Sequence, residues 1–160
     1  GQYAHGNEPS HHTTYMYAYS GEHYKIADKV RYINNELYTD EPDGLSGNED
    51  CGQMSAWYIL SSMGFYPVNP SNGAYVFGSP LFDEVSLNIP GQNKFKITAK
   101  NNSDENIYIQ SVSLNGEDYK YSYITHKQIL EGGELKFVMG PNPNKNFGTE
   151  KKYRPKSIVY

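Results

Sequence analysis

The stretch Gly44-Leu-Ser-Gly-Asn-Glu-Asp-Cys-Gly-Gln-Met-Ser-Ala-Trp-Tyr58 decides the fold of the N-terminal part of this chain. It is a glycine-rich turn that carries two adjacent acids, Glu49 and Asp50, and leads directly into an apolar helix. A carboxylate at a helix start is held by free backbone N–H groups, which favour its ionised form and suit it to act as a base or a ligand. A simpler interpretation stays open, in which Asp50 only caps the helix and Glu49 is solvated.

Three helices are predicted around this turn. The helix that follows it spans about residues 51–63 and ends at Gly64, a residue suited to a left-handed C-cap. Its side chains are apolar nearly all round, which is typical of a helix that is buried on most sides. Helices over residues 9–19 and 22–36 precede it, and two helices cannot cover a third completely. We therefore expect the native protein to contain more helices than this chain supplies.

A second turn of the same kind lies near the start of the chain, where residues 6–12 read Gly-Asn-Glu-Pro-Ser-His-His. It places Asn7 and Glu8 just before a helix and His11 and His12 in the first turn of that helix. Adjacent histidines point about a quarter of a turn apart, so they form a poor chelating pair and zinc is not expected. The alternative for both histidines is a partly buried pair with satisfied hydrogen bonds.

From about residue 67 the pattern changes to β-structure. Capping-box spacing predicts one short helix over residues 125–130, and the polar tail from Asn142 is expected to be an extended wrap or loose. The sequence thus predicts an α+β fold with a helical hairpin segment, residues 1–66, followed by an antiparallel β-sandwich-like region, residues 67–160. Alternating or β-rich residues predict strands near residues 74–77, 85–89, 95–99, 107–114 and 135–139.

Composition excludes several classes of function. A net charge of −4 over 160 residues argues against nucleic acid as a partner. No run of about twenty apolar residues is present, so no membrane span is expected. The 16 tyrosines suit sugar contacts, but they also suit ordinary cores and interfaces. The single cysteine, Cys51, cannot form an internal disulfide, and no flanking signature supports a cysteine hydrolase.

Together, the two turns and the sequence Met-Gly-Phe-Tyr-Pro at residues 63–67 resemble glycoside hydrolase family 92. The resemblance runs from residue 1 to about residue 148 and implies a calcium-dependent, inverting exo-α-mannosidase. Such an enzyme is much larger, with an N-terminal β-sandwich and an (α/α)6 barrel, so residues 1–66 would be the end of the barrel. The resemblance also implies a bacterial protein that is periplasmic, cell-surface or secreted. The expected partner of this chain is the upstream part of the same polypeptide.

The resemblance assigns roles to the acids of the two turns. An inverting glycosidase needs a general acid and a general base about 6.5–9.5 Å apart, with a water beside the base. The resemblance makes Asp50 the general base and places Glu49 where it would hold the water, the sugar or the metal, while the general acid would lie upstream. The calcium ligands are not implied, and the substrate would be a mannose-containing glycan, with α-1,2 linkage expected. The sugar pocket would be lined by Asn7, Glu8, His11, His12 and Asn48.

Two other interpretations stay open, a free-standing carbohydrate-binding module built on the β-region and an interaction domain that docks a partner chain. We expect the chain alone to be inactive, because it lacks the general acid. Helices that are meant to pack in a barrel would leave apolar surface bare, so self-association is also expected. The expected contributors are Tyr15, Tyr17, Tyr19, Met54, Trp57, Ile59 and Leu60.

Overall fold

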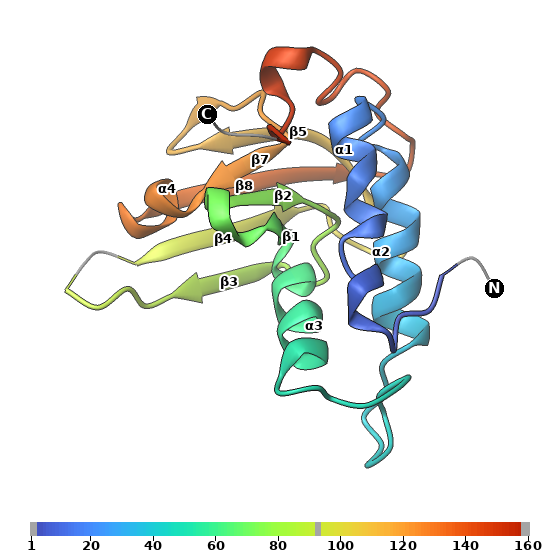
Figure 1. Ribbon diagram of the computed structural model, residues 1–160. Helices are drawn as coiled ribbons and strands as arrows, with labels where there is room; N and C mark the ends of the chain where they lie inside the picture. The colour runs from blue at the N-terminus through green and yellow to red at the C-terminus, as the bar shows by residue number, and fades with distance from the viewer. Residues whose placement is uncertain (1–2, 92–93, 158–160) are drawn as a thin grey trace.

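A computed structural model describes residues 3–91 and 94–157. Helices gather on one side and strands on the other, as Figure 1 shows. The α+β class is therefore confirmed for the described residues.

The first predicted helix is not continuous. It consists of the 3-10 turns η1 (Glu8–Ser10) and η2 (Thr13–Met16), followed by the short helix α1 (Tyr17–Ser20). A threonine pair in η2 and a proline in η1 lower helix propensity, which accounts for the breaks. The segment ends at Gly21, whose φ of 84° gives the left-handed C-cap that its position predicts.

The second helix, α2 (Lys25–Glu36), begins three residues later than predicted, and it lies beside α1 in a hairpin (Figure 1). Its inner face buries Ile26, Val30 and Ile33, at the helical spacing seen in the sequence. The hairpin expected from the sequence is confirmed, whereas membership of an (α/α)6 barrel stays a prediction.

The third helix, α3 (Gln53–Met63), ends at Gly64 with a φ of 103°, as predicted. It is buried on one side only, since Met54 and Trp57 are enclosed while Ile59 is 52% exposed. The expectation that Met54, Trp57 and Tyr15 contribute bare surface is wrong, because these side chains fill the core between the helices and β-structure. Ile59 remains a contributor to the uncovered face of α3.

The strands form two sheets. The smaller sheet has the order β1-β2-β7 and is antiparallel, while the larger has the order β3-β4-β8-β5-β6. In the larger sheet, β4 and β8 run parallel, with Phe95 opposite Gly133, so the expectation of purely antiparallel pairing is wrong for that pair. Two parallel strands need a long connection that returns the chain to the edge where the first strand began. Here β5, β6, β7 and helix α4 (His126–Leu130) provide that connection between β4 and β8. The strand bounds are β1 (Phe65–Asn69), β2 (Ala74–Phe77), β3 (Glu84–Leu87), β4 (Phe95–Lys100), β5 (Tyr108–Leu114), β6 (Glu117–Asp118), β7 (Tyr123–Thr125) and β8 (Gly133–Gly140).

Strand β1 connects the two parts of the fold. It crosses the predicted boundary at residues 66/67, and its Pro67 sits on an edge strand, where a missing N–H is tolerated. Neighbouring side chains on a strand point to opposite faces. Phe65 accordingly packs into the cluster between the sheets, and Tyr66 packs into the helical cluster around Trp57. Strand β1 thus joins the two clusters, and the buried side chains of His23 and Arg31 add hydrogen bonds from the helical part to Phe77 and Ser79.

The C-terminal segment wraps back over the molecule, as expected. The capping box of helix α4 (His126–Leu130) is present as predicted. After β8, the chain reaches the 3-10 turn η4 (Lys151–Tyr153), and the backbone N–H of Ser122 donates to the carbonyl oxygen of Tyr153 at 2.9 Å. Across residues 3–91 and 94–157, none of the helices has the length and apolar character needed to cross a membrane.

Candidate functional site

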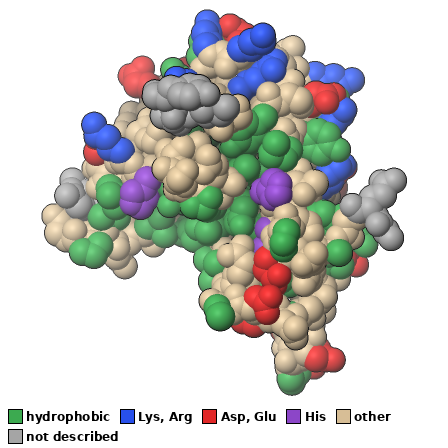
Figure 2. Space-filling view, viewed as in Figure 1, with side chains coloured by type: hydrophobic (Ala, Val, Ile, Leu, Met, Phe, Trp, Pro, Cys, Tyr) green, Lys and Arg blue, Asp and Glu red, His purple; other side chains and the backbone are tan. Residues whose placement is uncertain are grey.

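The two acidic turns meet through their glycines. A Cβ atom built on Gly6 would lie 2.3 Å from the carbonyl oxygen of Ser46, and one on Gly47 would lie 2.8 Å from the Cα of Gly6. Neither position has room for a side chain, so only glycine lets the two backbones touch. Figure 2 shows acidic side chains gathered on the face where the N-terminal turns and the loop before α3 meet.

Contact between the turns brings two carboxyl groups together. The side chains of Glu8 and Asp50 lie against each other, and each changes the pKa of the other. The hydrogen bond with Glu8 raises the pKa of Asp50, and the negative charge of Glu8 raises it further. The pKa of Glu8 is lowered, chiefly because its own backbone N–H donates to the carboxylate. Asp50 is exposed and Glu8 is half-buried.

The start of α3 differs from both sequence interpretations. Gly52 is the N-cap, and Asp50, Cys51 and Gly52 all adopt left-handed backbone conformations, with φ of 48°, 59° and 90°. Asp50 therefore does not cap the helix, and helix N–H groups do not hold its carboxylate. The raised pKa of Asp50 also contradicts the expectation that the helix start favours its ionised form. Strained conformations of this kind cluster at functional sites.

Glu49 takes the capping role instead. Its Oε1 accepts from the backbone N–H of Ser55 at 3.0 Å, and its Oε2 accepts from the Ser55 hydroxyl at 2.8 Å. Both carboxylate oxygens are thus engaged by the first turn of α3, so the interpretation of Glu49 as a solvated side chain is wrong. The capping carboxylate fixes the residue that immediately precedes Asp50.

His11 is buried and fully hydrogen-bonded. Its Nε2 lies 2.9 Å from the carbonyl oxygen of His5, so Nε2 carries the proton, and Nδ1 accepts from Gln53 at 3.1 Å. Burial lowers the pKa of His11, in keeping with a neutral ring. The backbone oxygen of His11 also accepts from the indole N–H of Trp57 at 2.9 Å. This geometry matches the satisfied, buried alternative for His11 and leaves no ring nitrogen free for a sugar, whereas His12 is exposed.

A second histidine, which the sequence did not single out, supports the loop that carries Asp50. The Nε2 of His5 donates to the hydroxyl of Tyr38 at 2.6 Å, and this hydroxyl donates to the carbonyl oxygen of Met54 at 3.0 Å. Burial lowers the pKa of His5 to about 4, and the neighbouring His11 adds to this effect, because two protonated imidazoles would repel each other. Tyr38 forms an isolated β-bridge with Leu45, which closes the loop. His5 directly precedes Gly6, so extending the first motif by one residue would have included it.

The remaining predicted residues lie at the surface. Asn7, His12 and Asn48 are exposed, and within the described ranges no hydrogen bond involves the side chain of any of them. Their amide and imidazole groups are free to meet a ligand. The structure therefore separates the predicted site residues into two groups. Glu49 and His11 support the two turns. The others reach the surface, namely Asn7, Glu8, His12, Asn48 and Asp50.

The site offers oxygen ligands for a hard cation, but not a full set. The Oε1 atom of Glu8 is enclosed and accepts no hydrogen bond from the described residues. Calcium takes six to eight oxygens, and no group of three or more His, Cys, Asp or Glu side chains within residues 3–91 and 94–157 could hold a metal. The Glu8 and Asp50 carboxylates fit a calcium ion as part of a ligand set that other groups would complete.

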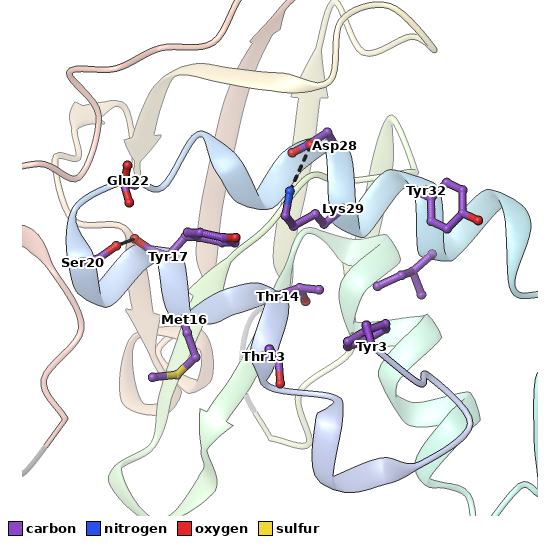
Figure 3. Close-up of a pocket in the computed structure, with 11 residues that line it drawn as sticks. Tyr3, Thr13, Thr14, Met16, Tyr17, Ser20, Glu22, Asp28, Lys29 and Tyr32 are labelled. Atoms are coloured by element: carbon purple, nitrogen blue, oxygen red, sulfur yellow. Dashed lines mark hydrogen bonds and ion pairs between the residues drawn. The ribbon is translucent and has the colours of Figure 1, made fainter. Parts of the chain in front are cut away.

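A larger hollow lies on the helical hairpin, away from these turns. It has a volume of about 840 Å³ and is lined from η2, α1 and α2. Figure 3 shows Tyr17 and Met16 on one side of it and Tyr32 on the other, with Lys29 paired to Asp28 at 3.2 Å. None of the predicted site residues lines it, so we treat it as uncovered helix surface rather than as the active site.

Comparison with known proteins identifies the family. Residues 1–141 match the glycosyl hydrolase family 92 catalytic domain. The chain therefore belongs to glycosyl hydrolase family 92.

Solved structures of this family contain the same fold. The family GH92 α-mannosidase BT3965 from Bacteroides thetaiotaomicron superposes with a TM-score of 0.94 at 41% identity, over 100% of this chain and 22% of that protein. The GH92 inverting mannosidase BT2199 from Bacteroides thetaiotaomicron VPI-5482 gives a TM-score of 0.92 at 42% identity, over 98% of this chain and 21% of that protein. These matches confirm that both turns and the β-region belong to one family fold.

A curated relative points the same way. An uncharacterized secreted glycosidase from Arthroderma benhamiae is 33% identical over 156 residues, which are 96% of this chain and 20% of that protein. The chain thus spans about a fifth of the length of the relatives it matches, as expected for a piece of a larger enzyme.

Proposed function

We propose that this chain supplies the general-base side of the active site of an inverting exo-α-mannosidase that acts on mannose-containing glycans, with α-1,2 linkages as the expected target. The observation that carries the proposal is the Gly6–Gly47 contact, which places Glu8 against Asp50 at the surface. Two of the similar solved structures are α-mannosidases, one of them an inverting mannosidase, and this supports the substrate class.

The geometry limits which group can be the general acid. An inverting enzyme needs room for a water between its acid and its base, which sets the two carboxyl groups about 6.5–9.5 Å apart. Glu8 interacts directly with Asp50, which leaves no room for that water between them, so we do not assign Glu8 as the acid opposite Asp50. Within this proposal the acid lies in the part of the enzyme upstream of this chain, as the family resemblance implies.

Within this proposal Asp50 removes a proton from the attacking water through its carboxylate. Asp50 must be ionised to do so, and its contact with Glu8 opposes ionisation. A bound calcium ion would supply positive charge that favours two ionised carboxylates and would bind sugar hydroxyls. Glu8 and Asp50 are the residues of this chain that we expect to face it. Asn7, Asn48 and His12 would contact the sugar, with Glu49 and His11 positioning the turns.

The observations also bear on the two alternatives. A free-standing carbohydrate-binding module or a docking domain would not need the strained backbone at Asp50 or the paired carboxylates. The α-mannosidase proposal accounts for both features. Location outside the cytoplasm agrees with the secreted relative, and a bacterial source stays a prediction.

The experiment uses the full-length enzyme that contains this chain. Hydrolysis of methyl α-mannoside or α-1,2-mannobiose, followed by proton NMR in the first seconds, should show β-mannose as the initial product, and removal of calcium with a chelator should abolish turnover. Initial release of α-mannose would contradict inversion, and full activity after chelation would contradict the calcium assignment. Failure to release mannose from either substrate would contradict the proposed function.

A further inference from the structure

A cavity on the β-region lies on different elements from the acidic turns. It has a volume of about 230 Å³ and lies between strands β5 and β6 and the C-terminal segment around residues 144–153. Figure 1 shows this segment folded back over the sheet, beside β5. Pockets that enclose drug-sized ligands measure about 300–1,000 Å³, so this one suits a smaller group such as one sugar ring.

Aromatic rings form one wall of the cavity. Tyr119 and Tyr153 line it, and Tyr121 packs between them, with ring centroids 5.4 Å from Tyr119 and 5.3 Å from Tyr153. Tyr121 is 38% exposed. Phe147 also lines the cavity, and its ring rests edge-on against the buried His23 at 4.9 Å. Tyrosine rings offer the flat apolar face and the hydroxyl that sugar rings meet in proteins.

Hydrogen bonds fix the opposite wall. The side-chain amide of Asn144 donates to the carbonyl oxygen of Gln110 at 2.8 Å, and the amide of Gln110 donates to the carbonyl oxygen of Asn142 at 2.9 Å. The backbone N–H of Ser122 donates to the carbonyl oxygen of Tyr153 at 2.9 Å. The tail is thus tied to the sheet on both sides of the cavity, which pre-organises it and lowers the cost of binding.

The acids on the cavity wall are paired with cations. The Nζ atom of Lys120 lies 3.9 Å from the carboxylate of Asp118, and Glu150 pairs at 3.1 Å with Lys152, which does not itself line the cavity. The wall therefore presents no concentrated charge of one sign to a phosphate or a strongly basic ligand. A neutral ligand with many hydroxyl groups meets both donors and acceptors instead, in addition to the tyrosine faces.

We propose that this cavity is a second, non-catalytic glycan site that binds one neutral pyranose unit of an oligosaccharide. The site goes beyond the proposed catalytic function and does not depend on Asp50. In an exo-acting glycan hydrolase such a site would hold the polysaccharide near the enzyme, because linked binding sites raise the effective concentration of substrate.

The test is an NMR titration of the ¹⁵N-labelled 160-residue chain with α-1,2-mannobiose, cellobiose and xylobiose. At least one of these should shift the backbone amides of residues 118–121 and 146–153 in a saturable way. Tyr121→Ala and Tyr153→Ala should each weaken that binding at least tenfold. Asp118→Asn, which leaves the aromatic wall intact, should weaken it threefold or more.

Matched controls separate this site from the catalytic one. Tyr32→Ala removes an exposed tyrosine on α2 and should leave the affinity unchanged, as should Asp50→Asn. In the full-length enzyme, Tyr121→Ala should leave turnover of a simple aryl α-mannoside unchanged. The proposal is overturned if none of the three disaccharides shifts these amides, or if Tyr32→Ala weakens binding as much as Tyr121→Ala. Binding of cellobiose or xylobiose alone would support the cavity and count against mannoside as its ligand.

Discussion

Gly6 and Gly47 touch backbone to backbone, so closely that a Cβ atom on Gly47 would fall 2.8 Å from the Cα of Gly6. This contact joins two Gly-Asn-Glu turns that are far apart in the sequence. It also explains how Glu8 reaches Asp50, because each acid lies only a few residues beyond its glycine.

Gly47→Ala should therefore push the two turns apart. Because backbone atoms rather than flexible side chains fill the space, the neighbours cannot give way cheaply, and we expect mannoside turnover by the full-length enzyme to fall at least tenfold. Steady-state kinetics at several substrate concentrations measures this loss. Gly91→Ala serves as a control, since nothing lies within 4 Å of its Cβ position and only its backbone conformation is strained. Equal loss of turnover in both variants would show that the contact has no special role.

The carboxylate of Glu49 should stabilise α3 through Ser55. Loss of a helix cap costs about 0.5–2 kcal/mol, so Glu49→Ala should lower the free energy of unfolding of the chain by about 1 kcal/mol. Glu49→Gln keeps one acceptor and should lose less. Urea unfolding of both variants and of Ser55→Ala, combined in a double-mutant cycle, measures the coupling. Independent, additive effects of Glu49→Ala and Ser55→Ala would contradict the assigned cap.

His23 should make the fold sensitive to acid. Its Nε2 lies 2.9 Å from the carbonyl oxygen of Phe77, and burial lowers its pKa to about 4. The unfolded chain takes up this proton near pH 6.5, whereas the folded chain resists it. The stabilisation is therefore complete above pH 6.5 and is lost as the pH falls toward 4, by about 3 kcal/mol in total.

The variant His23→Gln provides the comparison, because its amide can donate to Phe77 without titrating in this range. Its free energy of unfolding should fall less steeply than that of the unaltered chain between pH 6.5 and 4. Parallel curves for the two proteins in urea titrations at each pH would show that His23 does not contribute.

The isolated chain should self-associate through its helical side. Met16, Tyr32 and Ile59 are 44%, 61% and 52% exposed, and the groove between α1 and α2 is apolar for much of its surface. Exposed apolar patches of this kind favour association. Sedimentation velocity at micromolar concentration should show dimers or larger species, and Ile59→Glu with Tyr32→Glu should shift them toward monomer. A strictly monomeric unaltered chain would mean that these side chains need no partner.

The sequence predicted elements whose signal is local. Alternation identified β4 and β8, capping-box spacing identified α4, and Gly64 marked the end of α3. The β1 strand was missed because its proline argues against a strand unless the position is known to be an edge. The parallel pairing of β4 and β8 was missed because pairing partners depend on the path of the whole chain.

The candidate site was likewise predictable only where the sequence signal is local. Both motifs pointed to Glu8 and Asp50, but no local pattern indicates that Gly6 would lie on Gly47. The simpler interpretation of the sequence made Asp50 the cap, because aspartate at a helix start is a preferred cap. Three successive left-handed residues moved the helix start by two positions and gave that role to Glu49, which only the backbone geometry reveals.

The central claim is that Asp50 acts as the general base, and Asp50→Asn in the full-length enzyme tests it most directly. Removing a general base costs about 10²–10⁴-fold in rate. We expect kcat for α-1,2-mannobiose to fall by that factor while circular dichroism and the unfolding midpoint stay close to those of the unaltered enzyme. Asp43→Asn, a change in an exposed acid of the same loop, is the matched control and should leave kcat unchanged. An Asp50→Asn enzyme that turns over at near the original rate would contradict the account.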